Sequence, residues 1–437
     1  MGVGAFFEPM AVVFLLIGGA WINREPDVTR SYFQDYFRRC PAEQESLLDK
    51  AEKGAFDRTT ETLQSRPALR SQSPSFLLYE DDRWRTRELR FGWWSTTVST
   101  PNTAMFRNRL LSRLLHKFPF LLECWYWALV YWTYQLGRAF TAYTLKDGTI
   151  DVARQHAHQI IRLEQRLHIF WERDIQDFFI GLPGLMVWIN RLYSFVHIPG
   201  TIAFLVWLYY YSITRHRLQQ HRRDEAEETN VDLPTGPELY KARRRTMAVC
   251  NLIAFVVFTL WPCMPPRLLS EKNVPGLIGS VSRGYGFVDT VHGKNGTGSV
   301  WTSNKFCNQY AAVPSLHFGY SLIVGITIMT IPLSSRRQPL ALLSSNKKFP
   351  NTILTSWHRM LCVTLGLMYP LLILIAIVAT ANHFILDAVA GAIVCGLGWW
   401  GNSVLLNLLP VEDYFLWCLR IHKPEHLPLE MRDEMYH

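Results

Sequence analysis

Long apolar segments separated by charged loops constrain this chain more than any other feature. A helix of about 20 apolar residues crosses the roughly 30 Å hydrocarbon core of a bilayer. The mean hydropathy of +0.02 averages such segments with charged loops. We therefore predict an all-α polytopic membrane protein with a six-helix transmembrane core. The predicted spans are 119–143, 198–213, 247–263, 313–333, 357–379 and 384–409. Prolines and polar residues interrupt the stretch 178–214, and the second span can cross if its helix begins a few residues before 198.

Loop charge predicts the orientation of these spans. Lys and Arg accumulate on the cytoplasmic side of membrane proteins, and the loops 216–245 and 334–349 are both basic. With six spans they fall on one side, together with the C-terminal tail, and 264–312 falls on the lumenal or outer side. That segment contains Asn295, in the only N-glycosylation sequon of the chain. Cys263 and Cys307 flank the same loop, where they either form a disulfide or stay unpaired.

The predicted domain organisation follows from these spans. Residues 1–22 form a hydrophobic N-terminal segment, for which a signal anchor fits this orientation better than a cleaved signal peptide. Residues 23–118 form a charged, partly ordered cytoplasmic region, 119–409 the membrane domain and 410–437 a cytoplasmic tail. Within the first lumenal loop, apolar residues at helical spacing predict an amphipathic helix. It lies either on the membrane surface or against the protein core; the residues are Ile160, Leu163, Leu167, Phe170 and Phe178.

A net charge of +9 does not point to a nucleic-acid partner. The basic residues lie largely in loops predicted to be cytoplasmic, where the positive-inside bias and anionic lipid account for them. The bilayer is the expected partner, and the sequence leaves the oligomeric state open.

Histidines at span boundaries carry the predicted chemistry. His383 and Asp387 lie four residues apart on one helix face. A carboxylate at this spacing can accept the Nδ1 proton of the imidazole, so that Nε2 presents a lone pair, as a histidine nucleophile requires. The alternative is a structural pair in which His383 and Asp387 only hydrogen-bond each other at the helix end. A metal site is a third possibility, but no further Cys, His or Asp ligands occur at close spacing. His317 opens the fourth span at the same predicted depth, and Arg267 follows a proline pair that ends the third.

Three sequence blocks resemble a known superfamily. They are CMPPR, NQYAAVPSLHFG and ANHFILDAVAG, in this order along the chain. They are similar to the signature blocks of the type-2 phosphatidic acid phosphatase and haloperoxidase superfamily. Within it, they look most like the membrane branch of fungal inositol phosphorylceramide synthases and related inositolphosphotransferases. The resemblance covers about 119–409.

The resemblance implies a role for each matching residue. His383 would attack phosphorus to form a phosphohistidine, Asp387 would orient it, and His317 would protonate the leaving oxygen. Arg267 and Ser315 would bind phosphate oxygens. No metal or other cofactor is implied. The substrate would be a phospholipid or other lipid phosphate, the compartment the Golgi or endoplasmic reticulum, and the active site would face the lumen.

The sequence departs from the superfamily pattern at two positions. Ile377 occupies the place of a second phosphate-binding arginine, and Leu260 that of a lysine. Lys272 or Arg283 would have to compensate for the missing cation.

Three functions remain open at this point. A lipid phosphotransferase related to sphingolipid metabolism is the first. A hydrolase acting on a lipid phosphate or prenyl diphosphate would use the same residues with water as acceptor. A catalytically silent membrane scaffold would keep only the fold, although the intact histidines favour an enzyme.

Overall fold

The structure is a computed structural model. It describes residues 4–25, 83–144, 148–215, 217–218, 236–271, 274–290, 310–333 and 357–424. The described chain is largely helical, as predicted, with one two-stranded sheet that the sequence did not suggest. It divides into a first unit, Met1–Ile22 with Glu123–Leu406, and a second unit, Asn23–Leu122 with Asn407–His437.

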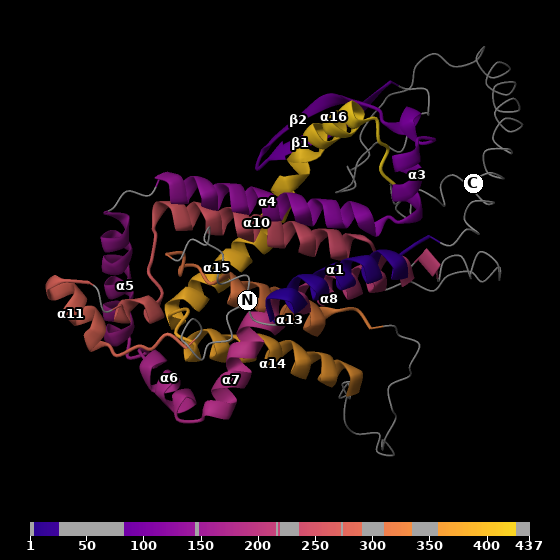
Figure 1. The fold of residues 1–437 in the computed structure, drawn as a ribbon. Helices are drawn as coiled ribbons and strands as arrows, with labels where there is room; N and C mark the ends of the chain where they lie inside the picture. The colour runs from indigo at the N-terminus through magenta and orange to yellow at the C-terminus, as the bar shows by residue number, and fades with distance from the viewer. Residues whose placement is uncertain are drawn as a thin grey trace, which may run out of the picture. The chain divides into compact units, whose positions relative to one another are not determined.

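Each of the six predicted spans falls on a helix (Figure 1). These helices are α4 (Phe120–Thr144), α8 (His197–Tyr209), α10 (Glu238–Leu260), α13 (Leu316–Thr330), α14 (Trp357–Ala379) and α15 (Ile385–Gly401). Two segments are long and apolar enough to cross a membrane, α14 and Ile385–Leu419. The helices α13 and Pro9–Ile22, within α1 (Gly4–Ile22), are apolar but shorter. These helices indicate membrane association, and the full set of six spans stays a prediction.

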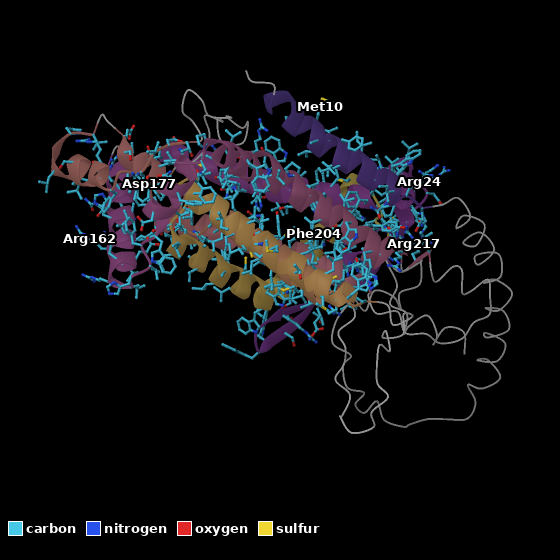
Figure 2. The ribbon with its side chains drawn as sticks, turned by 90° about the horizontal axis from the view of Figure 1, so that it is seen from below. Met10, Arg24, Arg162, Asp177, Phe204 and Arg217 are labelled. Carbon is cyan, nitrogen blue, oxygen red and sulfur yellow. The ribbon has the colours of Figure 1, made fainter. Side chains whose placement is uncertain are left out.

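Figure 2 shows where charged and aromatic side chains of the first unit lie along its helices. Arg162 and Asp177 lie at one end of the helices and Arg217 at the other, with Phe204 of α8 between them. In the predicted topology these three charged residues lie in loops outside the hydrocarbon, where a charge costs little.

The helix of the second predicted span begins before residue 198, as a crossing would require. The helix starts with α7 (Pro183–Arg191) and reaches α8 through a π-helical turn, η3 (Leu192–Val196). Pro199 has no N–H and so cannot make the usual hydrogen bond to the preceding helical turn. The wider π turn just before it makes room for the proline ring. A second π turn, η4 (Tyr210–Thr214), follows α8. In Figure 1, α1 lies beside α8.

The predicted amphipathic helix is two helices, α5 (Thr149–Arg166) and α6 (Glu172–Ile180). His168, at φ 57°, ends the first and turns the chain. Ile160 packs in a core cluster with the loop that follows α10, whereas Leu163 and Phe178 are exposed. One face therefore packs on the protein, and apolar side chains remain outside. A short 3₁₀ turn, η5 (Pro266–Ser270), and α11 (Gly276–Gly284) complete this end of the first unit.

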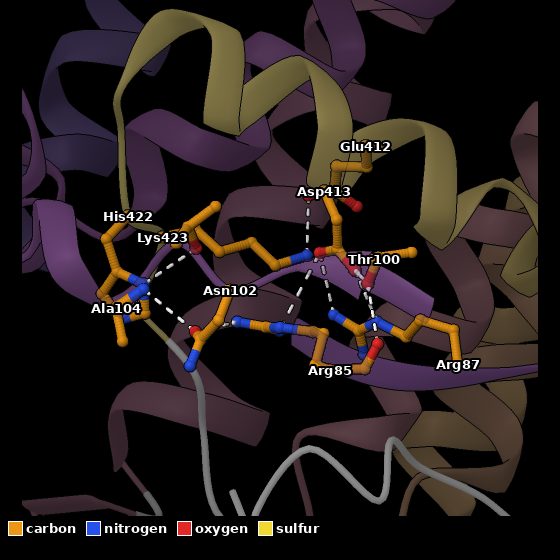
Figure 3. A network of polar contacts seen from close by, with 10 residues as sticks. Arg85, Arg87, Thr100, Asn102, Ala104, Glu412, Asp413, His422 and Lys423 are labelled. Atoms are coloured by element: carbon orange, nitrogen blue, oxygen red, sulfur yellow. Dashed lines mark hydrogen bonds and ion pairs between the residues drawn. The ribbon is translucent and has the colours of Figure 1, made fainter. Parts of the chain in front are cut away.

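The second unit contains a β-hairpin, β1 (Trp84–Phe91) and β2 (Trp94–Pro101), which pair antiparallel around Gly92 at φ 62°. Its other elements are η2 (Ala104–Phe106), α3 (Leu110–Lys117), part of η6 (Asn402–Leu408) and α16 (Leu409–Leu419). The hairpin packs on α16 through buried charges (Figure 3). Asp413 accepts two hydrogen bonds from Arg87, at 2.7 and 2.9 Å, and one from Thr100 at 2.8 Å. Arg85 lies 3.8 Å away.

We expect Asp413→Ala to destabilise the second unit by about 3–5 kcal/mol, because it leaves two buried guanidinium groups without their shared carboxylate. Limited proteolysis of the full chain should then show faster cleavage within 83–122. Glu88→Ala is the matched control, since Glu88 pairs with Arg90 on the exposed face of β1 and its loss should cost less than about 1 kcal/mol. Equal cleavage rates in the two variants would contradict this prediction.

Candidate active site

The loop between α14 and α15 holds His383 in a fixed backbone. Ile377 O accepts the amides of Asn382 and His383, which closes the end of α14. Ala381 adopts φ 50°, a conformation that costs a non-glycine residue about 1 kcal/mol. Its carbonyl accepts the backbone N–H of Arg267 at 2.9 Å. Strain of this kind persists where surrounding contacts enforce it, as at functional sites.

The hydrogen bonds of His383 determine its tautomer. Its Nδ1 lies 2.8 Å from Ala312 O and 3.4 Å from Asp387 Oδ2. Since a carbonyl oxygen only accepts, Nδ1 carries the hydrogen and neutral Nε2 presents a lone pair. Asp387 is fully buried and also caps α15, its Oδ2 accepting the amide of Phe384 at 2.9 Å. The nearer partner of the imidazole is thus the Ala312 carbonyl, which sequence reasoning did not identify.

His317 lies beside His383, the other histidine that the sequence predicts in the site. Their ring centroids are 5.7 Å apart. His317 also packs on Tyr193 at 4.8 Å and on His197 at 5.1 Å, both outside the three sequence blocks. His197 Nδ1 lies 3.1 Å from the hydroxyl of Tyr369. The spacing of Tyr193 and His197, one helical turn apart, was the available signal for this packing.

Arg267 is held at the same loop. Its Nε donates to Asn382 Oδ1 at 2.8 Å, next to His383 in the chain, and one terminal nitrogen lies 3.4 Å from Asp289 Oδ2. Its side chain is 11% exposed. The structure therefore places Arg267 against the loop that carries His383, and His317 packs beside His383.

Ser315 serves the backbone around the site. Its Oγ accepts the amide of Phe318 and so caps α13, while its own amide donates to Asp387 O at 2.9 Å. A Cβ on Gly391 of α15 would collide with the Ser315 carbonyl. Glycine at 391 therefore permits the close approach of α13 and α15 that places the two histidines side by side.

Two buried glutamates, which the sequence did not single out, lie against the start of α15. Glu172 Oε1 accepts the amide of Ile385, and Glu164 Oε1 accepts that of Leu386, each at 2.9 Å. Both side chains are fully buried. Burial raises the pKa of Glu164 to about 9, with the charge of Glu172 as the next cause, and burial also raises the pKa of Glu172.

The sequence pattern of the PAP2 superfamily matches residues 158–223, 235–361 and 349–401, more than half of the chain. The chain belongs to the PAP2 superfamily. It is therefore an enzyme of the phosphatase or phosphotransferase type, acting on phosphate esters. The matched segments include all five predicted site residues of this PAP2 enzyme: Arg267, Ser315, His317, His383 and Asp387. Neither a curated protein nor a solved structure matches the chain significantly.

Other sequence predictions for this PAP2 enzyme have different outcomes. Asn295, Cys307 and Lys272 lie outside the described residues, so glycosylation and the Cys263 pairing stay predictions. Arg283 donates to the Val274 carbonyl at 3.0 Å. Arg154 is a further buried cation, 3.4 Å from Glu271. Within the described ranges, no three His, Cys, Asp or Glu side chains group as metal ligands.

Proposed function

We propose that this PAP2 enzyme is a membrane lipid phosphotransferase, similar to the inositolphosphotransferases, with its site on the lumenal face of a Golgi or endoplasmic reticulum membrane. The observation that carries the proposal is the tautomer of His383. Its Nδ1 hydrogen is engaged by Ala312 O and Asp387, so the free lone pair is on Nε2, beside His317. An imidazole prepared in this way is a nucleophile toward phosphorus.

The first half-reaction forms a phosphohistidine. Nε2 of His383 attacks phosphorus and the bond from phosphorus to the leaving oxygen breaks. Protonated His317 gives its proton to that oxygen. Asp387 stabilises the positive charge on the His383 ring. The Arg267 guanidinium, held by Asn382, binds phosphate oxygens, and Ser315 is the proposed second donor.

The second half-reaction transfers the group to an acceptor. The acceptor hydroxyl gives its proton to His317 and its oxygen attacks phosphorus. The bond between phosphorus and Nε2 then breaks, and His383 returns to its first state. Water in place of the acceptor would give hydrolysis of a lipid phosphate or prenyl diphosphate through the same steps.

Product analysis tests the proposal. Purified full chain in detergent micelles receives phosphatidylinositol labelled in its phosphoinositol group, with and without ceramide or diacylglycerol. We expect the label in a new lipid only when an acceptor is present. Label in free phosphoinositol or free phosphate would replace the transferase with a hydrolase. An unchanged substrate pool under all conditions would reject phosphatidylinositol as donor.

A further inference from the structure

The start of α15 receives three carboxyl groups from three helices. Asp387 of α15 accepts the amide of Phe384, Glu172 of α6 accepts that of Ile385, and Glu164 of α5 accepts that of Leu386. These amides are consecutive and directly follow His383. A helix N-terminus normally offers such groups to an anion such as phosphate. In this chain they are already engaged, which leaves phosphate binding to side chains.

The two glutamates are neighbours, because they accept the consecutive amides of Ile385 and Leu386. Their second oxygens, Oε2 of Glu164 and Oε2 of Glu172, are buried and accept no hydrogen bond from a donor in the described ranges. Two ionised carboxylates so placed would repel each other without compensation. A single proton held between them satisfies both oxygens. Burial and then the charge of Glu172 raise the pKa of Glu164 to about 9, so Glu164 is the partner that holds the proton near neutral pH.

Other titratable groups face the pair. Asp387 on α15 raises the pKa of both glutamates by its charge, and His383 lies beyond it at 3.4 Å. Cys263, after α10, lies close enough to Glu164 and Asp387 for their charges to act on its thiol. The charges that act on the two glutamates are thus those of carboxylates, and they favour retention of one proton.

We propose that Glu164 and Glu172 are positioning residues for the reaction: they share one proton and, through the amides of Ile385 and Leu386, hold the backbone that carries His383. The inference rests on the proposed function, in which His383 is the nucleophile. Loss of the shared proton at alkaline pH places a second negative charge beside Asp387. The resulting repulsion loosens the start of α15 and displaces His383.

Two substitutions at Glu164 separate this role from simple packing. In Glu164→Gln the amide oxygen still accepts the Leu386 N–H, and the amide N–H donates to Glu172 as the shared proton does. We expect turnover near pH 7 within about threefold of the wild type. The wild-type loss of turnover as the pH rises toward 9 should be absent in this variant. Glu164→Ala leaves the Leu386 amide without its acceptor, so kcat should fall about tenfold or more at every pH with little change in KM.

Glu238→Gln is the matched control, because Glu238 pairs with Lys241 on the partly exposed start of α10. It should keep the wild-type rate and pH profile. An alkaline decline retained in Glu164→Gln, or equal losses in the Gln and Ala variants at neutral pH, would overturn the proposal.

Two measurements without turnover keep this proposal distinct from the proposed function. Infrared spectra should show a protonated carboxyl band at pH 7 in the wild type and in His383→Ala, but a weaker one in Glu164→Gln. The usual pKa of Glu164 is 4.5, and its value in the fold is about 9. Its contribution to stability is therefore full below 4.5 and lost as the pH rises through 9. The thermal unfolding temperature should fall over this range in the wild type and less in Glu164→Gln. Identical spectra and identical unfolding profiles would reject the shared proton whatever the substrate.

Discussion

His383→Ala should lower turnover by about 10⁴-fold or more, because the variant has no imidazole to form the covalent intermediate. Residual catalysis from Arg267 and substrate binding would remain, as it does when a nucleophile is removed from other enzymes. Initial rates with labelled phosphatidylinositol measure the loss. Rapid acid-free quenching of the wild type should also trap label on the protein, and this label should be absent in the variant.

His116→Ala is the control for this loss, since His116 lies in the second unit and is 47% exposed beside Glu25. Its rate should equal that of the wild type. Turnover in His383→Ala within tenfold of the wild type would remove His383 from the role of nucleophile and the phosphohistidine with it.

The helices were predictable because a long apolar segment that crosses a bilayer has to form a helix to satisfy its backbone hydrogen bonds. The hairpin was not, because its buried residues are charged. Arg85 and Arg87 are buried and alternate with exposed residues along β1. From sequence alone, these arginines indicate a segment exposed to solvent. Their partner, Asp413, lies 326 residues beyond Arg87 in the chain. Local patterns cannot reveal a strand whose buried face is neutralised by a distant carboxylate.

The candidate site shows the same division between local and distant signals. The spacing of His383 and Asp387 placed both on one helix face, and the resemblance supplied His317 and Arg267. Sequence reasoning gave Asp387 the whole task of fixing the tautomer, whereas Ala312 O is the closer acceptor. A backbone carbonyl has no residue type that a motif could record. Glu164 and Glu172 were missed for a related reason. In the sequence each is an ordinary charged residue of an amphipathic helix, and only the fold shows that it binds the start of α15.

Replacing His317 should produce an effect that depends on the leaving group. A general acid matters most when the departing oxygen is a poor leaving group, so His317→Ala should slow transfer from phosphatidylinositol by about 10²–10⁴-fold. An aryl phosphate, whose phenolate leaves without a proton, should lose much less. Tyr193→Phe keeps the ring that packs on His317 and removes only the hydroxyl, so it should stay within about twofold for both substrates.

The comparison of the two substrates separates proton transfer from packing. The rings of Tyr193, His197 and His383 all lie within 5.7 Å of the His317 ring, measured between centroids, so the alanine variant also leaves a space beside the nucleophile. Displacement of His383 into that space would slow both substrates equally, because the attack on phosphorus is common to them. A selective loss with the lipid substrate requires the missing proton. Equal losses would therefore mean that His317 only holds His383 in place. Another group would then protonate the leaving oxygen.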